Sequence, residues 1–401
     1  MVHRAFKRIS MAATVAALSA APVPLLAADD LPWRDVLAGA FLYPFLTDAE
    51  VAGRMDDTRA WVEGHGTAVT IRYPGISGAL AGEVAMAGAA VAPDLWRGVL
   101  PAGRHLVTIL TGGEASAVAH SPAADDDAVS TAEAFMARAA LLGPGDELVV
   151  ADGVYSDWRL QVDAQGTAAT PVLIRPRTPG GVTFRRDTRL RVTGRHVVLK
   201  GFRFDHCGPD VTVLLAGAQD CRVTQCHFFH CGNPLSTFGH IVRVDAGSHR
   251  NRVDHCFFTG SKSMSLAQRI TTAAEIGTHN RFDHNVFRDI YRYWINGQEN
   301  IQIGQNQRGA SGAAESFCTV EYNLFDHAWG DGEIISNKSS SNVIRFNLAS
   351  HCRRSAFTLR GGDRVRFEGN AMVHNGDGLR VMGRRHTIVN NLIRDMPGFR
   401  S

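Results

Sequence analysis

A short phrase that recurs through the second half of the chain constrains the fold more than any other feature. Each copy has an apolar residue, two variable residues, Asn or Cys, one further residue and a second apolar residue. Seven copies follow one another, with the Asn or Cys at Cys226, Cys256, Asn285, Asn323, Asn347, Asn370 and Asn391. Self-similarity at intervals of about 20 to 50 residues is typical of solenoids, in which each repeat buries its apolar face against its neighbours.

The form of the repeat favours strands over helices. Each copy is too short for an amphipathic helix, and its alternation suits a strand. No helical spacers of the kind found in βαβ units separate the copies. An Asn at one position of each coil can form a ladder, with amides bonded at roughly 4.8 Å, and it tolerates the left-handed conformation of a tight corner. An antiparallel sandwich gives no reason for such an Asn. We therefore predict an all-β protein, a right-handed parallel β-helix.

The start of the chain has the pattern of a signal peptide. The basic residues Arg4, Lys7 and Arg8 precede an apolar run that ends at the small pair Ala27-Ala28. Two prolines interrupt this run, which is short for a membrane span. Residues 1–28 are thus predicted to be removed. The mature protein would be exported, periplasmic or extracellular, without a membrane span.

The rest of the chain divides into three parts. Residues 29–111 form an extra N-terminal segment of unknown role, and residues 112–129 are rich in Gly, Ala, Ser and Asp, as expected of a linker. The sequence Ser130-Thr131-Ala132-Glu133 resembles a capping box that opens a short capping helix to Leu142. Residues 130–401 would then be the β-helix domain. The chain stops soon after the last repeat, so we expect either a partner over the terminal coil or a truncated form.

Charge and cysteine content argue against nucleic acid and zinc. The chain has 42 basic and 39 acidic side chains, and the predicted leader holds three of the basic ones and no acid. The mature protein is therefore neutral overall, and attraction to a polyanion would need local clustering. The seven cysteines form no C-x-x-C pair, so a zinc site is not expected. We expect them to be small buried residues stacked inside the β-helix.

The segment from Asp331 to Ser339 carries most of the candidate chemistry. Asp331 and Glu333 are two residues apart, so on a strand both carboxylates would face one side. Lys338 and Arg360 are about one coil apart and should lie on adjacent rungs. Asn296 lies one long coil before Asp331. Two carboxylates and an amide carbonyl are hard oxygen ligands of the kind that Ca²⁺ prefers.

The stretch from about residue 130 to 396 resembles polysaccharide lyase family 6, which contains alginate lyases and chondroitinase B. The matching text covers about two-thirds of the chain. Its segments are Asn296-Gly297, 301–304, 319–325, 332–339, 358–360 and 378–381. The resemblance implies a β-eliminating lyase with a parallel β-helix fold.

Carried over to matching positions, the resemblance implies a role for each candidate residue. Asn296, Asp331 and Glu333 would bind Ca²⁺, which neutralises the sugar carboxylate and stabilises an enolate-like transition state. Lys338 would be the general base that removes the C5 proton, and Arg360 the general acid. Because a guanidinium rarely loses its proton, Arg360 is better suited to stabilise the leaving oxygen while water supplies the proton.

Substrate recognition is where the sequence departs from the family. Arg380 would hold a sugar carboxylate, as the resemblance implies. The family usually has Glu at Asp331, His at Gly361 and Arg at Gln302. The last two family residues touch substrate, so these departures leave the elimination residues in place and the identity of the polymer open.

Three functions remain open at this point. The leading hypothesis is a Ca²⁺-dependent lyase of an acidic polysaccharide, with alginate ahead of dermatan sulfate. A uronate C5-epimerase shares the proton abstraction but does not break the chain. A non-catalytic carbohydrate-binding β-helix would need neither Lys338 nor Arg360 beside a metal site.

Overall fold

The computed structural model describes residues 127–396, apart from short gaps, and seven strands between residues 59 and 111. The gaps are at 179, 234, 237–238, 246, 271–275, 295 and 306–313. The chain divides into two compact units, residues 1–119 and 120–401. The predicted signal peptide and most of the predicted linker lie outside the described residues. Among the helices that the structure describes, none is long and apolar enough to cross a membrane.

The first unit is built from antiparallel strands. One sheet has the order β1-β7-β3-β4 and the other β2-β6-β5. The strands are β1 (Arg59–Gly64), β2 (Thr67–Arg72), β3 (Ile76–Ala81), β4 (Val84–Ala85), β5 (Gly88–Ala92), β6 (Leu95–Leu100) and β7 (Gly103–Thr111). This pairing distinguishes the N-terminal segment from the parallel strands that follow.

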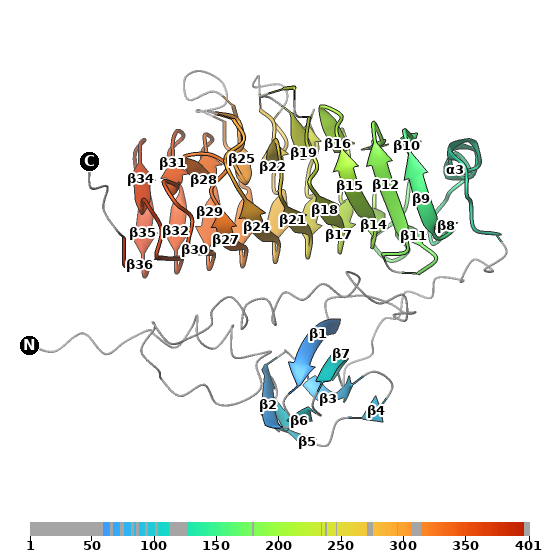
Figure 1. Cartoon of the computed structure of the whole chain (residues 1–401), viewed down its shortest axis with the longest axis horizontal. Helices are drawn as coiled ribbons and strands as arrows, with labels where there is room; N and C mark the ends of the chain where they lie inside the picture. The colour runs from blue at the N-terminus through green and yellow to red at the C-terminus, as the bar shows by residue number, and fades with distance from the viewer. Residues whose placement is uncertain are drawn as a thin grey trace, which may run out of the picture. The chain divides into compact units, whose positions relative to one another are not determined.

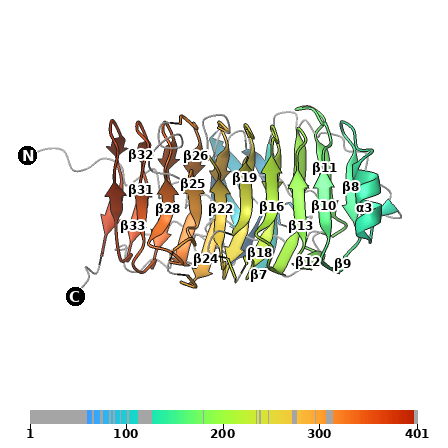
Figure 2. The ribbon, with the colours of Figure 1, turned by 90° about the horizontal axis from the view of Figure 1, so that it is seen from above.

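The second unit is a parallel β-solenoid, as the repeat predicts (Figures 1 and 2). Its first sheet has nine strands: β10 (Arg159–Val162), β13 (Arg189–Val192), β16 (Val211–Ala216), β19 (His240–Asp245), β22 (Met264–Gln268), β25 (Ile301–Ile303), β28 (Glu333–Asn337), β31 (Ala356–Leu359) and β34 (Leu379–Val381). The solenoid begins at residue 147, earlier than the recurring phrase, because its first coils are built without the ladder Asn.

The other two sheets have ten strands each and complete every coil. The second sheet has β8 (Glu147–Val150), β11 (Val172–Pro176), β14 (Val197–Lys200), β17 (Arg222–Thr224), β20 (Arg252–Asp254), β23 (Arg281–Asp283), β26 (Thr319–Glu321), β29 (Val343–Arg345), β32 (Arg366–Glu368) and β35 (Thr387–Val389). The third has β9 (Gly153–Ser156), β12 (Val182–Arg186), β15 (Arg203–Cys207), β18 (His227–Phe229), β21 (Phe257–Thr259), β24 (Val286–Ile290), β27 (Leu324–Ala328), β30 (Leu348–Ser350), β33 (Ala371–Val373) and β36 (Leu392–Arg394).

An asparagine ladder runs along the inside of the corner between the second and third sheets. Asn285 donates to Asn323 at 3.1 Å, Asn323 to Asn347 at 2.9 Å, and Asn347 to Asn370 at 2.9 Å. The ladder that the repeat predicts is therefore present. The left-handed conformation falls one residue earlier than predicted, as at Tyr322 with a φ of 54°. The preceding residue makes the turn, so the Asn side chain can point inward and bond its neighbour.

Aromatic rings and thiols fill the core behind the ladder. The third sheet contributes a continuous stack with ring centroids 4.8 to 4.9 Å apart, formed by Phe204, Phe228, Phe258, Phe287 and Phe325. This separation matches the spacing between strands. All seven cysteines are buried and free, as expected. Burial raises the pKa of the Cys318 thiol to about 12, which makes it unreactive.

A short helix covers the first coil. It is α3 (Ala132–Ala139), and it lies beside β8 at the start of the solenoid (Figure 1). The hydroxyl of Thr131 accepts a hydrogen bond from the Ala134 N–H at 3.1 Å, so Thr131 is the N-cap. The helix ends three residues before the predicted Leu142. Its buried Phe135 closes the end of the core.

Candidate active site

Lys338 and Arg360 follow two neighbouring strands of the first sheet. In the β28–β31 pair, Asn337 is in register with Leu359, and the Arg360 N–H donates to the Asn337 carbonyl at 2.8 Å. The structure thus puts the two residues next to each other at the carboxyl ends of adjacent strands. This is the arrangement that their spacing of about one coil predicts.

Glu333 at the other end of β28 brings two arginines together. Its carboxylate is buried, and Oε1 lies 2.9 Å from Nη1 of Arg360 and 3.5 Å from Nη1 of Arg380. Ser336 donates its hydroxyl to Oε2. The side chains of Arg360 and Arg380 are 36% and 44% exposed. Since a guanidinium has five N–H donors, both arginines keep donors that a ligand can use.

The sequence predicted Asp331 on the same strand as Glu333, but the structure places it in a bend before β28. It is 7% exposed, and its Oδ2 accepts hydrogen bonds from the Gly297 N–H at 2.9 Å and the Gln298 N–H at 3.4 Å. These contacts bring the segment that contains Asn296 against Asp331. The Asn296 side chain itself is exposed.

Glu299 is a residue of the site that sequence reasoning missed. Its Oε1 lies 3.4 Å from Nζ of the buried Lys338 and accepts a hydrogen bond from Gln302 at 2.8 Å. Burial raises the pKa of the Glu299 carboxyl, Lys338 opposes that rise, and Asp331 adds to it. Glu299 lies two residues before β25. Ile301 of β25 is in register with Ile335 of β28, so the same register places Glu299 opposite Glu333. The importance of Glu299 thus becomes visible only once the strand register is known.

The site offers oxygen ligands that fit a hard cation. Three buried carboxylates belong to it, Glu299, Asp331 and Glu333. Oε2 of Glu299 is buried and has no hydrogen-bond partner among the described residues, which fits a cation held nearby. Among the described residues, the oxygens of these three carboxylates do not all lie within 4.8 Å of one another. Cation binding would therefore have to draw them together.

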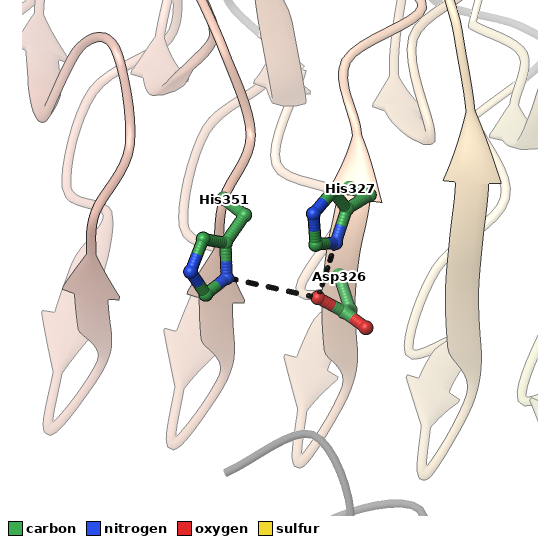
Figure 3. A group of neighbouring side chains, drawn as sticks. All are labelled: Asp326, His327 and His351. Carbon is green, nitrogen blue, oxygen red and sulfur yellow. Dashed lines mark hydrogen bonds and ion pairs between the residues drawn. The ribbon is translucent and has the colours of Figure 1, made fainter. Parts of the chain in front are cut away.

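A separate group of possible metal ligands lies on the third sheet and has a structural explanation. Asp326 Oδ1 is 2.8 Å from Nδ1 of His327 and 3.9 Å from Nδ1 of His351 (Figure 3). The Asp326–His327 contact recurs in earlier coils, in the pairs Asp205–His206, Asp254–His255 and Asp283–His284. Because the contact recurs at the ends of strands in both the second and the third sheet, it is a general feature of the coils and does not single out Asp326 as a metal site.

Comparisons with known proteins agree with the fold. The model of the family described as Chondroitinase B matches residues 129–401. The solved structure of the alginate lyase AlyGC, of the PL6 family, is 31% identical over 68% of this chain and 39% of that chain, with a TM-score of 0.60. A mannuronic acid specific family 6 lyase from human gut microbiota is 28% identical, with a TM-score of 0.60.

Other comparisons bear on the fold alone. The PL6 family lyase Pedsa3628 from Pseudopedobacter saltans is 21% identical over 67% of this chain, with a TM-score of 0.56. No curated protein matches the chain. The chain spans 39% of the length of AlyGC and 63% of that of the gut lyase.

Proposed function

The chain belongs to the chondroitinase B family of polysaccharide lyases, and on this basis we propose that it cleaves a uronate polymer by β-elimination. One observation carries the proposal: Lys338 and Arg360, which follow adjacent strands, each contact a buried carboxylate, Glu299 and Glu333 respectively. Elimination next to a sugar carboxylate requires a base that removes the C5 proton and a cation that stabilises the leaving oxygen. Binding alone would not need this pair.

Lys338 is the proposed general base, which would accept the C5 proton after giving up its own proton to Glu299 or to water. The C5 proton of a uronate is weakly acidic, so the base must be held close to it and shielded from water. Lys338 is 6% exposed, and Glu299 holds its amino group from the neighbouring rung. Glu299 in turn is fixed by Gln302, the residue that stands where the family has Arg.

Arg360 and Arg380 are the proposed anion-binding groups. Arg360 lies next to Lys338 and would stabilise the leaving oxygen with a charge-assisted hydrogen bond. Arg380 is one strand further and would hold a sugar carboxylate. Glu333 fixes both guanidinium groups through a single oxygen, which leaves their outward N–H groups for substrate.

We propose Ca²⁺ as the cofactor, with Asn296, Asp331 and Glu333 as its ligands. When bound, Ca²⁺ would neutralise the uronate carboxylate and so make the C5 proton more acidic. The backbone contacts of Gly297 and Gln298 keep Asp331 beside the Asn296 segment. The unpaired Glu299 Oε2 supports a cation in this region.

Alginate is the first substrate to test, because two of the similar structures are described as an alginate lyase and a mannuronic acid specific lyase. Dermatan sulfate is the second. The leader predicted at residues 1–28 would export the protein, and we propose that it meets this polymer in the periplasm or outside the cell.

An absorbance assay for unsaturated product tests the proposal. The protein is incubated with alginate, dermatan sulfate and pectate, each with Ca²⁺ or with chelator. We expect product from alginate with Ca²⁺ and none from Lys338→Ala, while Lys200→Ala on the second sheet keeps full activity. No unsaturated product from any of these polymers would refute the lyase, and C5 inversion without cleavage, seen by NMR, would identify an epimerase.

A further inference from the structure

Two pairs of aromatic side chains lie in segments that border the candidate active site. Tyr291, Tyr293 and Trp294 lie between β24 and β25, and Trp329 directly follows β27. The rings of Tyr291 and Trp329 are 5.5 Å apart and edge-on, and those of Tyr293 and Trp294 are 5.2 Å apart. Tyr291 and Tyr293 are 51% and 52% exposed. Both tyrosines are therefore about half exposed to solvent, although the Tyr291 hydroxyl also donates to Asp289 at 3.0 Å.

One buried glutamine fixes the segment that carries these rings. Gln298 is fully buried, and its Oε1 accepts from the N–H groups of Tyr293 at 2.7 Å and Trp294 at 3.2 Å. Its Nε2 donates to the carbonyls of Ser261 at 2.7 Å and Tyr291 at 2.8 Å. All four hydrogen bonds of the amide are used, so the tyrosines are presented by a fixed backbone.

The same segment supports the active site. The Gln298 N–H donates to Asp331, next to the bond from Gly297. Gly330 leaves room for Gln298, because a Cβ there would come within 2.8 Å of the glutamine side chain. The aromatic segment and the acidic end of the site are therefore held together by shared contacts.

We propose that Tyr291 and Tyr293 form a sugar-binding platform that receives the apolar face of a pyranose ring next to the sugar that is cleaved. This inference rests on the proposed function. A pyranose ring presents a face of C–H bonds, and a tyrosine ring combines an apolar face with a polar edge that matches the hydroxyls. Tyr291 and Tyr293 present such rings, partly exposed, on a fixed backbone. The surface of two tyrosines is far smaller than the roughly 800 Å² per partner that a stable protein interface buries, so it is too small for a protein partner.

Binding to an inactive variant separates the platform from catalysis. Defined alginate tetrasaccharide is titrated into Lys338→Ala and followed by calorimetry. We expect Tyr293→Ala and Tyr291→Ala, each added to Lys338→Ala, to weaken binding about tenfold. Tyr293→Phe, which keeps the ring, should stay within about twofold. Phe317→Ala is the matched control, since Phe317 is 43% exposed and stacks on His279 at another corner.

The active protein gives the second readout. On the polymer that it cleaves, Tyr293→Ala should raise KM and leave kcat unchanged, with an unaltered unfolding midpoint. Unsaturated product together with unchanged tetrasaccharide affinity and KM in both alanine variants would overturn the platform and leave the lyase standing. Self-association that Tyr293→Ala abolishes would overturn it in favour of a second copy of the chain. Absence of product and of binding would refute both proposals.

Discussion

At the scale of single residues, the site depends on how a nearly buried ammonium group is held. Removing a charged amine from water is costly unless an opposite charge accompanies it. Glu299 supplies that charge to Lys338 at 3.4 Å, and Gln302 fixes the shared oxygen. Lys338, Arg360 and Glu333 are recognisable from spacing in the sequence. Glu299 was missed because its significance comes from the register between β25 and β28, which spacing alone does not fix.

Replacing Glu299 with Gln should impair turnover more than binding. The amide keeps the size of the side chain but removes the charge that positions Lys338. We expect kcat to fall by about 10- to 100-fold with a smaller change in KM. Glu315→Gln is the control, because Glu315 forms a comparable ion pair with Arg364 on the exposed surface. An unchanged kcat in Glu299→Gln would show that Glu299 does not position the base.

Two buried histidines should make the protein sensitive to mild acid. Burial, together with neighbouring arginines, lowers the pKa of His227 and of His240 to about 3. Both residues are neutral when folded but would be protonated below about pH 6.5 when unfolded. Between pH 6.5 and about 3 the unfolded state therefore binds more protons than the folded state. The free energy of unfolding is highest above pH 6.5 and decreases as the pH falls towards 3.

The expected size of this effect is up to about 1.4 kcal/mol per pH unit for each histidine. Urea unfolding at pH 7, 6, 5 and 4 measures it. His240→Gln should reduce the slope, whereas His386→Gln, on the exposed end of the solenoid, should leave it unchanged. Identical slopes in the parent and in His240→Gln would contradict the assignment of His240 as a buried neutral group.

At the scale of elements, the fold is set by positions that repeat from coil to coil. The Asn phrase was sufficient to predict parallel coils and the ladder, because one residue type at one phase admits few other structures. It placed the left-handed residue one position late, since the sequence does not say which residue makes the turn. The segment from Tyr291 to Gln298 could not be predicted, because the partners of Gln298 come from distant residues such as Ser261.

An alanine in the middle of the ladder should destabilise the solenoid strongly. Oδ1 of Asn347 accepts two hydrogen bonds from Asn323, and its amide group donates to Val320 and Asn370. Asn347→Ala leaves these buried groups unpaired, for which we expect a loss of about 2 to 4 kcal/mol. Asn391→Ala, at the exposed end of the ladder, should cost less. Equal urea midpoints for the two variants would show that the ladder does not stabilise the fold.

At the scale of the whole molecule, the three sheets of the solenoid have different tasks. The corner between the second and third sheets holds the coils together through the ladder. The first sheet carries Lys338 and Arg360, and the acids that balance them come from the segments entering β25 and β28. Ligands from these two segments would join neighbouring coils through a shared cation. Cation binding should then stabilise the folded solenoid as well as support catalysis.

Calcium should therefore raise the thermal unfolding midpoint through the site on the first sheet. At a hundredfold excess over the dissociation constant, the gain in unfolding free energy would be about 2.7 kcal/mol. We expect Asp331→Asn to lose most of this gain, because it removes one charged ligand near the Asn296 segment. His351→Gln, in the Asp326 group on the third sheet, is the control and should keep it (Figure 3). A gain that survives Asp331→Asn but disappears in His351→Gln would move the cation to the third sheet and leave Asn296, Asp331 and Glu333 without a metal.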